Sequence, residues 1–95
     1  MMALIGHSIL IIDTNAAAYV VRLRAAIHDA GAKSIIARTA GTARERVKRF
    51  KFSAAVVNVE HRALAEELGI LYLLYSPGEP PRIILAGLER LLLGP

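Results

Sequence analysis

The sequence contains no cysteine among its 95 residues, and only 5% of them are aromatic. Without cysteine, neither a disulfide framework nor a thiolate metal site can form. No apolar run approaches the length of a membrane span, and the first residues lack a basic segment followed by a long apolar one. We therefore expect one cytoplasmic, soluble domain over residues 1–95 that makes no contact with a membrane.

The usual short motifs of catalysis and nucleotide binding are also missing. No glycine-rich G-x-G-x-x-G or Walker pattern occurs, and no serine lies in a G-x-S-x-G motif. The three histidines, His7, His28 and His61, are not paired with a second ligand type at helical spacing, which argues against a zinc site. These absences predict a protein that is not an enzyme and that holds no cofactor and no metal.

Apolar residues are abundant for so short a chain, at 55% of the sequence against 21% charged residues. They gather in four β-rich runs that alternate with four helical patterns, and the runs show little alternation with polar residues. Strands with this pattern are covered on both faces, and the alternation of type indicates parallel β-α units with right-handed crossovers. The runs are Ser8–Ile12, Lys33–Ala37, Ala54–Val59 and Ile70–Tyr75.

The helical patterns have recognisable ends. The first is expected to start near Asn15 and to stop at Gly31, and the third, Arg62 to Leu68, is closed by Gly69. The last follows Pro80 and Pro81, which suit a helix start. Apolar stripes predict the faces turned to the sheet: Ala16, Val20, Leu23, Ile27 and Ala30 in the first helix, and Ile84, Leu88, Leu91 and Leu92 in the last.

The second helical pattern contains a capping box formed by Thr42 and Glu45, with Ala43, Val47 and Phe50 facing inward. Six basic residues lie between Arg38 and Lys51 against one acid, so the net charge of +4 originates in this segment. The cluster is either a solvated face or a surface for nucleic acid or an acidic partner. Salt-sensitive phosphate contacts would support binding, whereas the lack of interleaved aromatics argues against it. The candidate anion-binding residues are Arg44, Arg46, Lys48, Arg49 and Lys51.

Polar residues follow the predicted strands at their carboxyl ends, where chemistry usually lies in a parallel sheet. They are Asp13, Thr14 and Asn15 after the first strand, Thr39 after the second, Asn58 and Glu60 after the third, and Ser76 after the fourth. Magnesium prefers several carboxylate oxygens, and Asp13 alone provides few of them unless Glu60 turns back toward it. The simpler alternative is that Asp13 and Asn15 cap the first helix.

The pattern resembles a response-regulator receiver domain of the CheY-like family. "SILIIDTN" resembles the first receiver strand, "AAVVNVEH" resembles the third, and "AAAYVVRLRAAIHDAGAKSIIARTAGTARERV" resembles the segment between them. The resemblance implies a flavodoxin-like α/β fold, a parallel sheet flanked by helices. A receiver has five strands, so this chain would be shortened to about four, in the order 2-1-3-4.

The resemblance also implies that the phosphorylation site of the family is degenerate here. Asp13 matches the first acid of the family's pair, but Thr14 replaces the second, and Asn58 occupies the position of the phospho-accepting aspartate. An amide forms no acyl phosphate because its nitrogen is a poor nucleophile and its oxygen has no full negative charge. Ser76 matches either the family's switch hydroxyl or the position of its catalytic lysine. Asp13, Thr14 and Ser76 would then be remnants of the acidic pocket.

A degenerate receiver of this kind is expected to act in two-component-type signalling through contacts with other proteins. The last run carries no charge and no proline, and an apolar edge strand is prone to pair with another chain unless it is covered. We expect a homodimer and an unidentified signalling partner, although the same side chains could simply fill a core. A phosphorelay through another residue is the remaining alternative. The predicted interface residues are Ile70, Tyr72, Leu74, Ile83 and Leu85.

Overall fold

The computed structural model describes residues 2–13 and 17–94, and its centre is a sheet of four parallel strands. The strands are β1 (Ser8–Ile12), β2 (Lys33–Ala37), β3 (Ala54–Asn58) and β4 (Tyr72–Tyr75), in the order β2-β1-β3-β4. Both the parallel pairing and the strand order were predicted from the sequence. β2 and β4 are therefore the two edges of the sheet, and β1 and β3 lie inside it.

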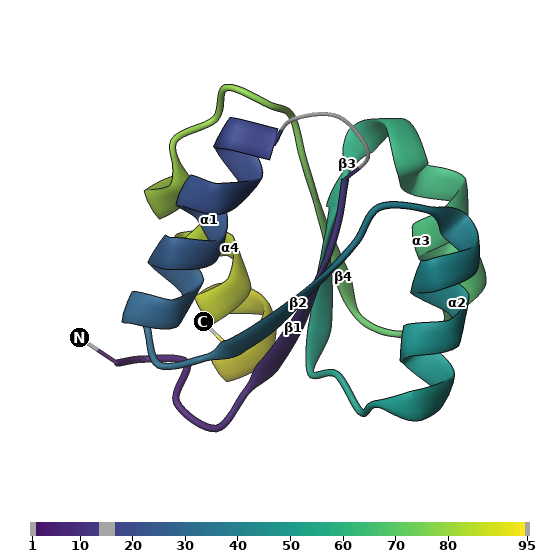
Figure 1. The fold of residues 1–95 in the computed structure, drawn as a ribbon. Coiled ribbons are helices and arrows are strands. Elements are labelled where there is room, and N and C mark those ends of the chain that lie inside the picture. Colours follow the sequence, from purple (N-terminus) through teal and green to yellow (C-terminus); the bar gives the residue numbers. More distant parts are fainter. Residues whose placement is uncertain (1, 14–16, 95) are drawn as a thin grey trace.

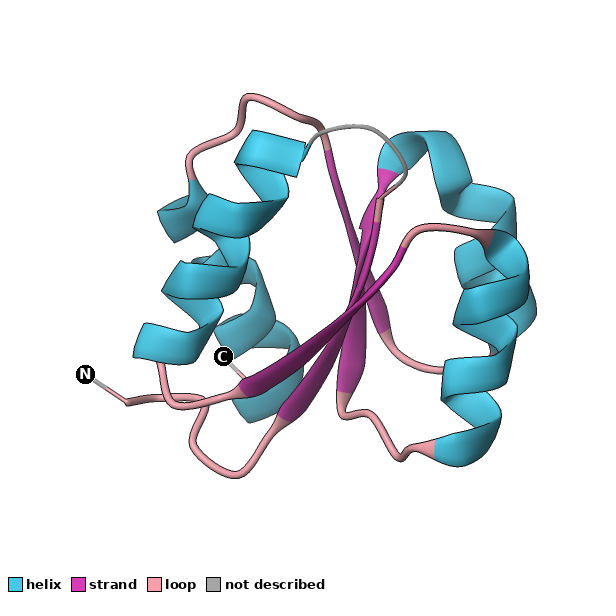
Figure 2. Ribbon diagram, viewed as in Figure 1, coloured by secondary structure: helices cyan, strands magenta, loops and turns pink. Residues whose placement is uncertain are grey.

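Helices cover both faces of the sheet and give the molecule three layers (Figures 1 and 2). Helices α1 (Ala17–Asp29) and α4 (Pro81–Leu93) lie on one face, and α2 (Ala40–Arg49) and α3 (Arg62–Leu68) lie on the other. A single 3₁₀ turn, Val59–His61, leads from β3 into α3. Within the described residues, no helix has the length and apolar character needed to cross a membrane.

The apolar stripes found in the sequence form two cores. Val20, Leu23 and Ile27 of α1 pack with Ile84 and Leu88 of α4 against one face of β1 and β3. The other face carries a smaller core, to which α2 and α3 contribute Ala43, Leu64 and Ala65. Alternate residues of the strands enter opposite cores, as expected for strands covered on both sides. Ala16 and Asn15, which the sequence placed at the start of the first helix, lie outside the described residues.

The start of α2 differs from the prediction. The side chain of Thr39, not that of Thr42, caps this helix: Thr39 Oγ1 accepts a hydrogen bond from the backbone N–H of Thr42 at 3.1 Å. The helix begins earlier than expected because Thr39, two residues after the end of β2, already satisfies an exposed N–H of the first turn. Glu45 consequently lies beyond that turn and pairs with Arg49 at 3.6 Å.

The end of α2 and the bounds of two strands also differ. Phe50 was predicted to face inward, but it is 43% exposed because the backbone turns extended there, and Phe52 packs against the core instead. β3 stops at Asn58, where the side chain caps the 3₁₀ turn, so Val59 is not part of the strand. β4 starts at Tyr72 rather than at Ile70.

The turn after α1 generates the first prediction. Gly31 has φ +96°, and a Cβ there would lie 3.1 Å from the Cα of Ile5, so Gly31→Ala should lower the free energy of unfolding by about 1–2 kcal/mol. The control is Gly41→Ala inside α2, where a Cβ meets nothing within 4 Å. It should stabilise the protein by about 0.5–1 kcal/mol, because alanine favours the helix. Urea unfolding measures both changes, and equal signs for the two variants would contradict the prediction.

Candidate functional site

Three side chains from neighbouring strands meet at the carboxyl edge of the sheet. Asp13 follows β1, Asn58 ends β3 and Tyr75 ends β4, and the register pairs Asn58 with Tyr75. Parallel strands bring their carboxyl ends to the same edge, so the topology alone places these residues together. All three are buried, with Asp13 only 2% exposed and Asn58 only 3% exposed. We call this group the strand-end cluster.

Hydrogen bonds in the strand-end cluster converge on one carboxylate oxygen. Asn58 Nδ2 donates to Asp13 Oδ2 at 3.3 Å, and the hydroxyl of Tyr75 donates to the same oxygen. The amide oxygen of Asn58 is also used, because it accepts from the backbone N–H of Glu60 at 3.0 Å. A buried carboxylate is costly unless donors solvate it, and here an amide and a phenol, both uncharged groups, donate to it.

A second tyrosine extends the cluster toward α1. Tyr19 stacks on Tyr75 with ring centroids 5.5 Å apart and donates its hydroxyl to the backbone carbonyl of Glu79 at 2.6 Å. Glu79 belongs to the β4–α4 loop, where its side chain accepts from the backbone N–H of Ser76 at 2.7 Å. The two tyrosines thus connect the end of β1, the body of α1 and the loop before α4.

Burial raises the pKa of Tyr75 well above its usual range, and the hydrogen bond to Asp13 raises it further. The pKa of Tyr19 is also raised, first by burial and then by the charge of Glu79, while Arg22 opposes the change. Both phenols therefore remain protonated at neutral pH and act as hydrogen-bond donors. The chemistry that this arrangement supports is hydrogen-bond donation from the hydroxyl of Tyr75 to the carboxylate of Asp13.

The residues predicted for the pocket are not all brought together. The structure joins Asp13 and Asn58, whereas Ser76 is exposed and Thr14 lies outside the described residues. Glu60 is exposed too, and among the described residues no group of three histidine, aspartate or glutamate side chains is placed to hold a metal ion. Sequence reasoning missed Tyr75 and Tyr19. The signal for Tyr75 was its position at the end of a buried run, next to Ser76.

The predicted interface residues lie at or near the β4 edge. Ile70, Tyr72 and Leu74 are partly buried against the core on the α2 and α3 side. Leu85 is partly buried against the opposite core, while Ile83 on α4 is 50% exposed. All but Ile83 therefore contribute to packing within the chain, and only part of their surface is available to another molecule.

The basic residues of the second helical pattern do not form one free patch. Arg44 pairs with Glu67 of α3 through two hydrogen bonds, one of them 3.0 Å from Nη2 to Oε1, and Arg49 pairs with Glu45. This exposed pairing raises the pKa of Arg44 and lowers that of Glu67. Arg46 is partly buried, which leaves Lys48 and Lys51 as the exposed members that make no ion pair in the described part of the chain.

The strand-end cluster predicts a loss of stability in alkali. Tyr75 ionises at about pH 10 in the unfolded chain but only at higher pH in the folded protein, so its contribution is complete below pH 10. Above pH 10 the unfolded chain binds fewer protons, and the free energy of unfolding should fall by about 1.4 kcal/mol per pH unit for this group. Urea unfolding at a series of alkaline pH values measures this slope.

Tyr75→Phe is the variant that tests the assignment. At neutral pH it should cost about 1.5–3 kcal/mol, because Asp13 loses a donor, and above pH 10 its stability should fall less steeply than that of the wild type. Tyr72→Phe, whose side chain faces the other core, should keep a neutral-pH stability close to the wild type. An unchanged alkaline slope in Tyr75→Phe would show that the phenol of Tyr75 does not cause the effect.

No protein-family model matches the sequence, and no curated protein is detectably similar to it. Among solved structures, the fold is similar to the crystal structure of a response regulator receiver domain protein (CheY-like) from Methanospirillum hungatei. The TM-score is 0.67 at 18% sequence identity, and the match covers 90% of this chain and 93% of that chain. With its four parallel strands in the order 2-1-3-4 and helices on both faces, the chain has a shortened form of the CheY-like receiver fold.

Proposed function

We propose that this chain is a cytoplasmic, receiver-like interaction domain of two-component-type signalling that accepts no phosphoryl group. The observation that carries the proposal is the identity and bonding of the residue at the end of β3. Asn58 provides an amide there, and its nitrogen donates to the carboxylate of Asp13. In a receiver fold this is the position of the phospho-accepting carboxylate, and an amide has neither the charge nor the nucleophilicity that phosphorylation needs.

The surroundings of Asn58 support the same conclusion. Two uncharged donors already share one oxygen of Asp13, and the amide oxygen of Asn58 is held by the N–H of Glu60. Magnesium binds through several hard oxygen ligands, commonly with more than one carboxylate, whereas Asp13 is one carboxylate and one of its oxygens already accepts two hydrogen bonds. The function of such a domain therefore lies in its surfaces.

Incubation with a small-molecule phosphodonor and magnesium tests the lack of phosphorylation. The intact mass of the wild-type protein should stay unchanged, while a phosphorylatable receiver treated in parallel gains one phosphoryl group. Asn58→Asp should also gain little, because restoring one carboxylate leaves Tyr75 bonded to Asp13 and supplies no further metal ligand. A gain of one phosphoryl group by the wild type would refute the proposed function.

We further propose that the chain forms a homodimer through the β4 edge. The backbone carbonyl of Leu71 accepts from the N–H of Ala55 on β3, and peptide groups alternate in direction along a strand. Tyr72 and Leu74 therefore direct their N–H and C=O groups away from β3, toward the open edge. An uncharged edge strand with free backbone groups readily pairs with another strand.

A groove between β4 and α4 supports self-association. Leu73 and Leu74 line it from opposite faces of the strand, together with Glu79, Arg82 and Arg90. Both signs of charge occur in this groove, so a two-fold axis can bring the acid of one copy toward a base of the other. The exposed side chains of Leu71 and Ile83 add apolar area that a second copy would cover.

The dimer predicts a defined effect of a charge at the β4 edge. Leu71→Asp should weaken self-association by about tenfold or more, because the second copy would bury a charge in place of an apolar contact, and Leu71 is not among the residues that line the groove with the two arginines. Sedimentation velocity over a range of protein concentrations, at low and high salt, measures the change. Ile5→Asp is the matched control, because Ile5 is 66% exposed in the segment before β1. A wild-type protein that is monomeric at micromolar concentration would contradict the dimer.

A further inference from the structure

The opposite edge of the sheet, β2, also carries unpaired backbone groups. Lys33 donates its N–H to the carbonyl of His7 at 3.0 Å, and the carbonyl of Ala37 accepts from the N–H of Asp13 at 3.3 Å. The odd-numbered residues of β2 therefore face β1. Because peptide groups alternate along a strand, Ser34 and Ile36 direct their N–H and C=O groups outward. β2 is the last strand of the sheet on this side, so no strand in the described chain pairs with these groups.

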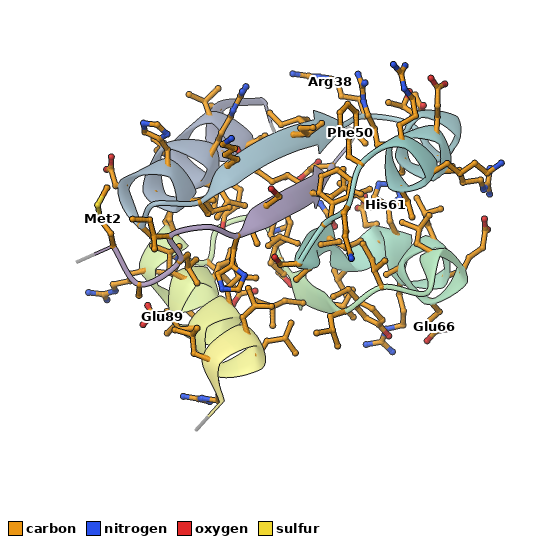
Figure 3. The ribbon with its side chains drawn as sticks, turned by 90° about the horizontal axis from the view of Figure 1, so that it is seen from below. Met2, Arg38, Phe50, His61, Glu66 and Glu89 are labelled. Carbon is orange, nitrogen blue, oxygen red and sulfur yellow. The ribbon has the colours of Figure 1, made fainter. Side chains whose placement is uncertain are left out.

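Two grooves flank the β2 edge, one on each face of the sheet. The groove on the α1 side has a volume of about 520 Å³ and is lined by Val21, Arg24 and His28. The groove on the α2 side has a volume of about 430 Å³ and is lined by Phe50, Lys51 and Phe52. Lys33 and Ser34 border both grooves, so the grooves meet at the edge strand. In Figure 3, Phe50 lies beside this margin of the sheet.

The ionisable side chains that line the two grooves are all basic. Their linings include Arg24, His28, Lys33 and Lys51, and no aspartate or glutamate is among the lining residues. Glu45, the nearest acid on α2, lines neither groove and pairs with Arg49. Two copies of this edge would therefore repel each other, unlike the β4 edge with its mixed charges. The edge is complementary to an acidic molecule of a different kind.

We propose that the β2 edge binds an extended acidic segment of a partner protein, which adds to the sheet as a fifth strand. The backbone of the segment would pair with Ser34 and Ile36, and successive side chains would enter the α1-side and α2-side grooves in turn. Acidic side chains suit the groove of Arg24 and His28. Apolar side chains suit the groove of Phe50 and Phe52, where they cover a phenylalanine ring that is 43% exposed in the free chain.

A peptide is a better match to this surface than a nucleic acid. Outward N–H and C=O groups offer a strand both donors and acceptors, whereas a phosphate chain uses donors only. The grooves also contain apolar side chains, among them Val21 and the two phenylalanines, that phosphates would leave uncovered. The inference deepens the proposed interaction role and rests on it, but it does not depend on the lack of phosphorylation or on the dimer.

The test uses a synthetic peptide of about seven residues with alternating glutamate and valine, long enough to span β2. Fluorescence anisotropy should show saturable binding that weakens with salt, because the contacts include exposed charges. Two control peptides separate the contributions. A peptide with lysine in place of glutamate should bind at least about tenfold more weakly, and so should the glutamate peptide methylated on alternate backbone nitrogens to prevent strand pairing.

Two variants of Ser34 test the place of binding. Ser34→Pro removes an outward N–H without taking a hydrogen bond from β1, since proline is tolerated at an edge position of this kind. It should weaken peptide binding by about tenfold or more, while Ser34→Ala, which keeps the N–H, should bind like the wild type. Circular dichroism checks the fold of both. If Ser34→Pro does not fold, Arg24→Glu should weaken binding, whereas Arg22→Glu, which lines neither groove, should not.

The outcomes are distinct. No binding of the glutamate peptide, or equal binding of its methylated form, overturns strand addition at β2. Tighter binding of a single-stranded oligonucleotide of the same charge, unaffected by Ser34→Pro, would assign the basic surface to nucleic acid instead and would overturn the inference as well. Neither result bears on phosphorylation, which the intact mass measures separately. Phosphorylation of the wild type would refute the proposed function but would leave a measured peptide affinity in place.

Discussion

The arrangement of the carboxyl ends of β1, β3 and β4 depends on one buried carboxylate. Asp13 lies at the end of β1 and receives hydrogen bonds from the last residues of β3 and β4, so three strand ends are held around a single charge. The two donors, an amide and a phenol, are uncharged and help to solvate this charge. Tyr75 also contacts α1, because Tyr19 stacks on its ring. Tyr19 in turn donates a hydrogen bond to the backbone of the β4–α4 loop. Packing on the α1 side and the geometry of the strand ends are therefore linked.

A four-stranded sheet has two edges, and this chain equips them differently. The β4 edge is uncharged along its strand and has acidic and basic side chains in the adjoining groove, which suits a second copy of the same surface. The β2 edge is bordered by basic side chains alone, which suits a different molecule. Because the edges lie at opposite ends of the strand order, both surfaces could be occupied at once. Under the two proposals, the short sheet binds a second copy at one edge and an acidic partner at the other.

The sequence was sufficient for the fold because burial on both faces leaves an unmistakable pattern. The runs around Ile9–Ile12 and Ala54–Val57 contain no polar residue, and the stripe through Val20, Leu23 and Ile27 fixes the inner face of α1. Only part of the strand-end cluster could be predicted from the sequence. Asp13 and Asn58 are polar residues at strand ends, whereas Tyr75 counts as apolar in any pattern, and its hydroxyl matters only because the register places it beside Asp13. Phe50 was misplaced because helical periodicity does not reveal where a helix stops.

The hydrogen bonds within the strand-end cluster bear on whether the domain can switch between two conformations. A domain that switches needs two arrangements of similar free energy, and a ligand or a modification that favours one of them. Here the amide and the phenol both donate to one oxygen of the carboxylate within the same chain, and a second tyrosine stacks on the ring of the first. Under the proposed function the domain would therefore be a constitutive component, whose contribution to signalling is set by its abundance and by competition for its edges.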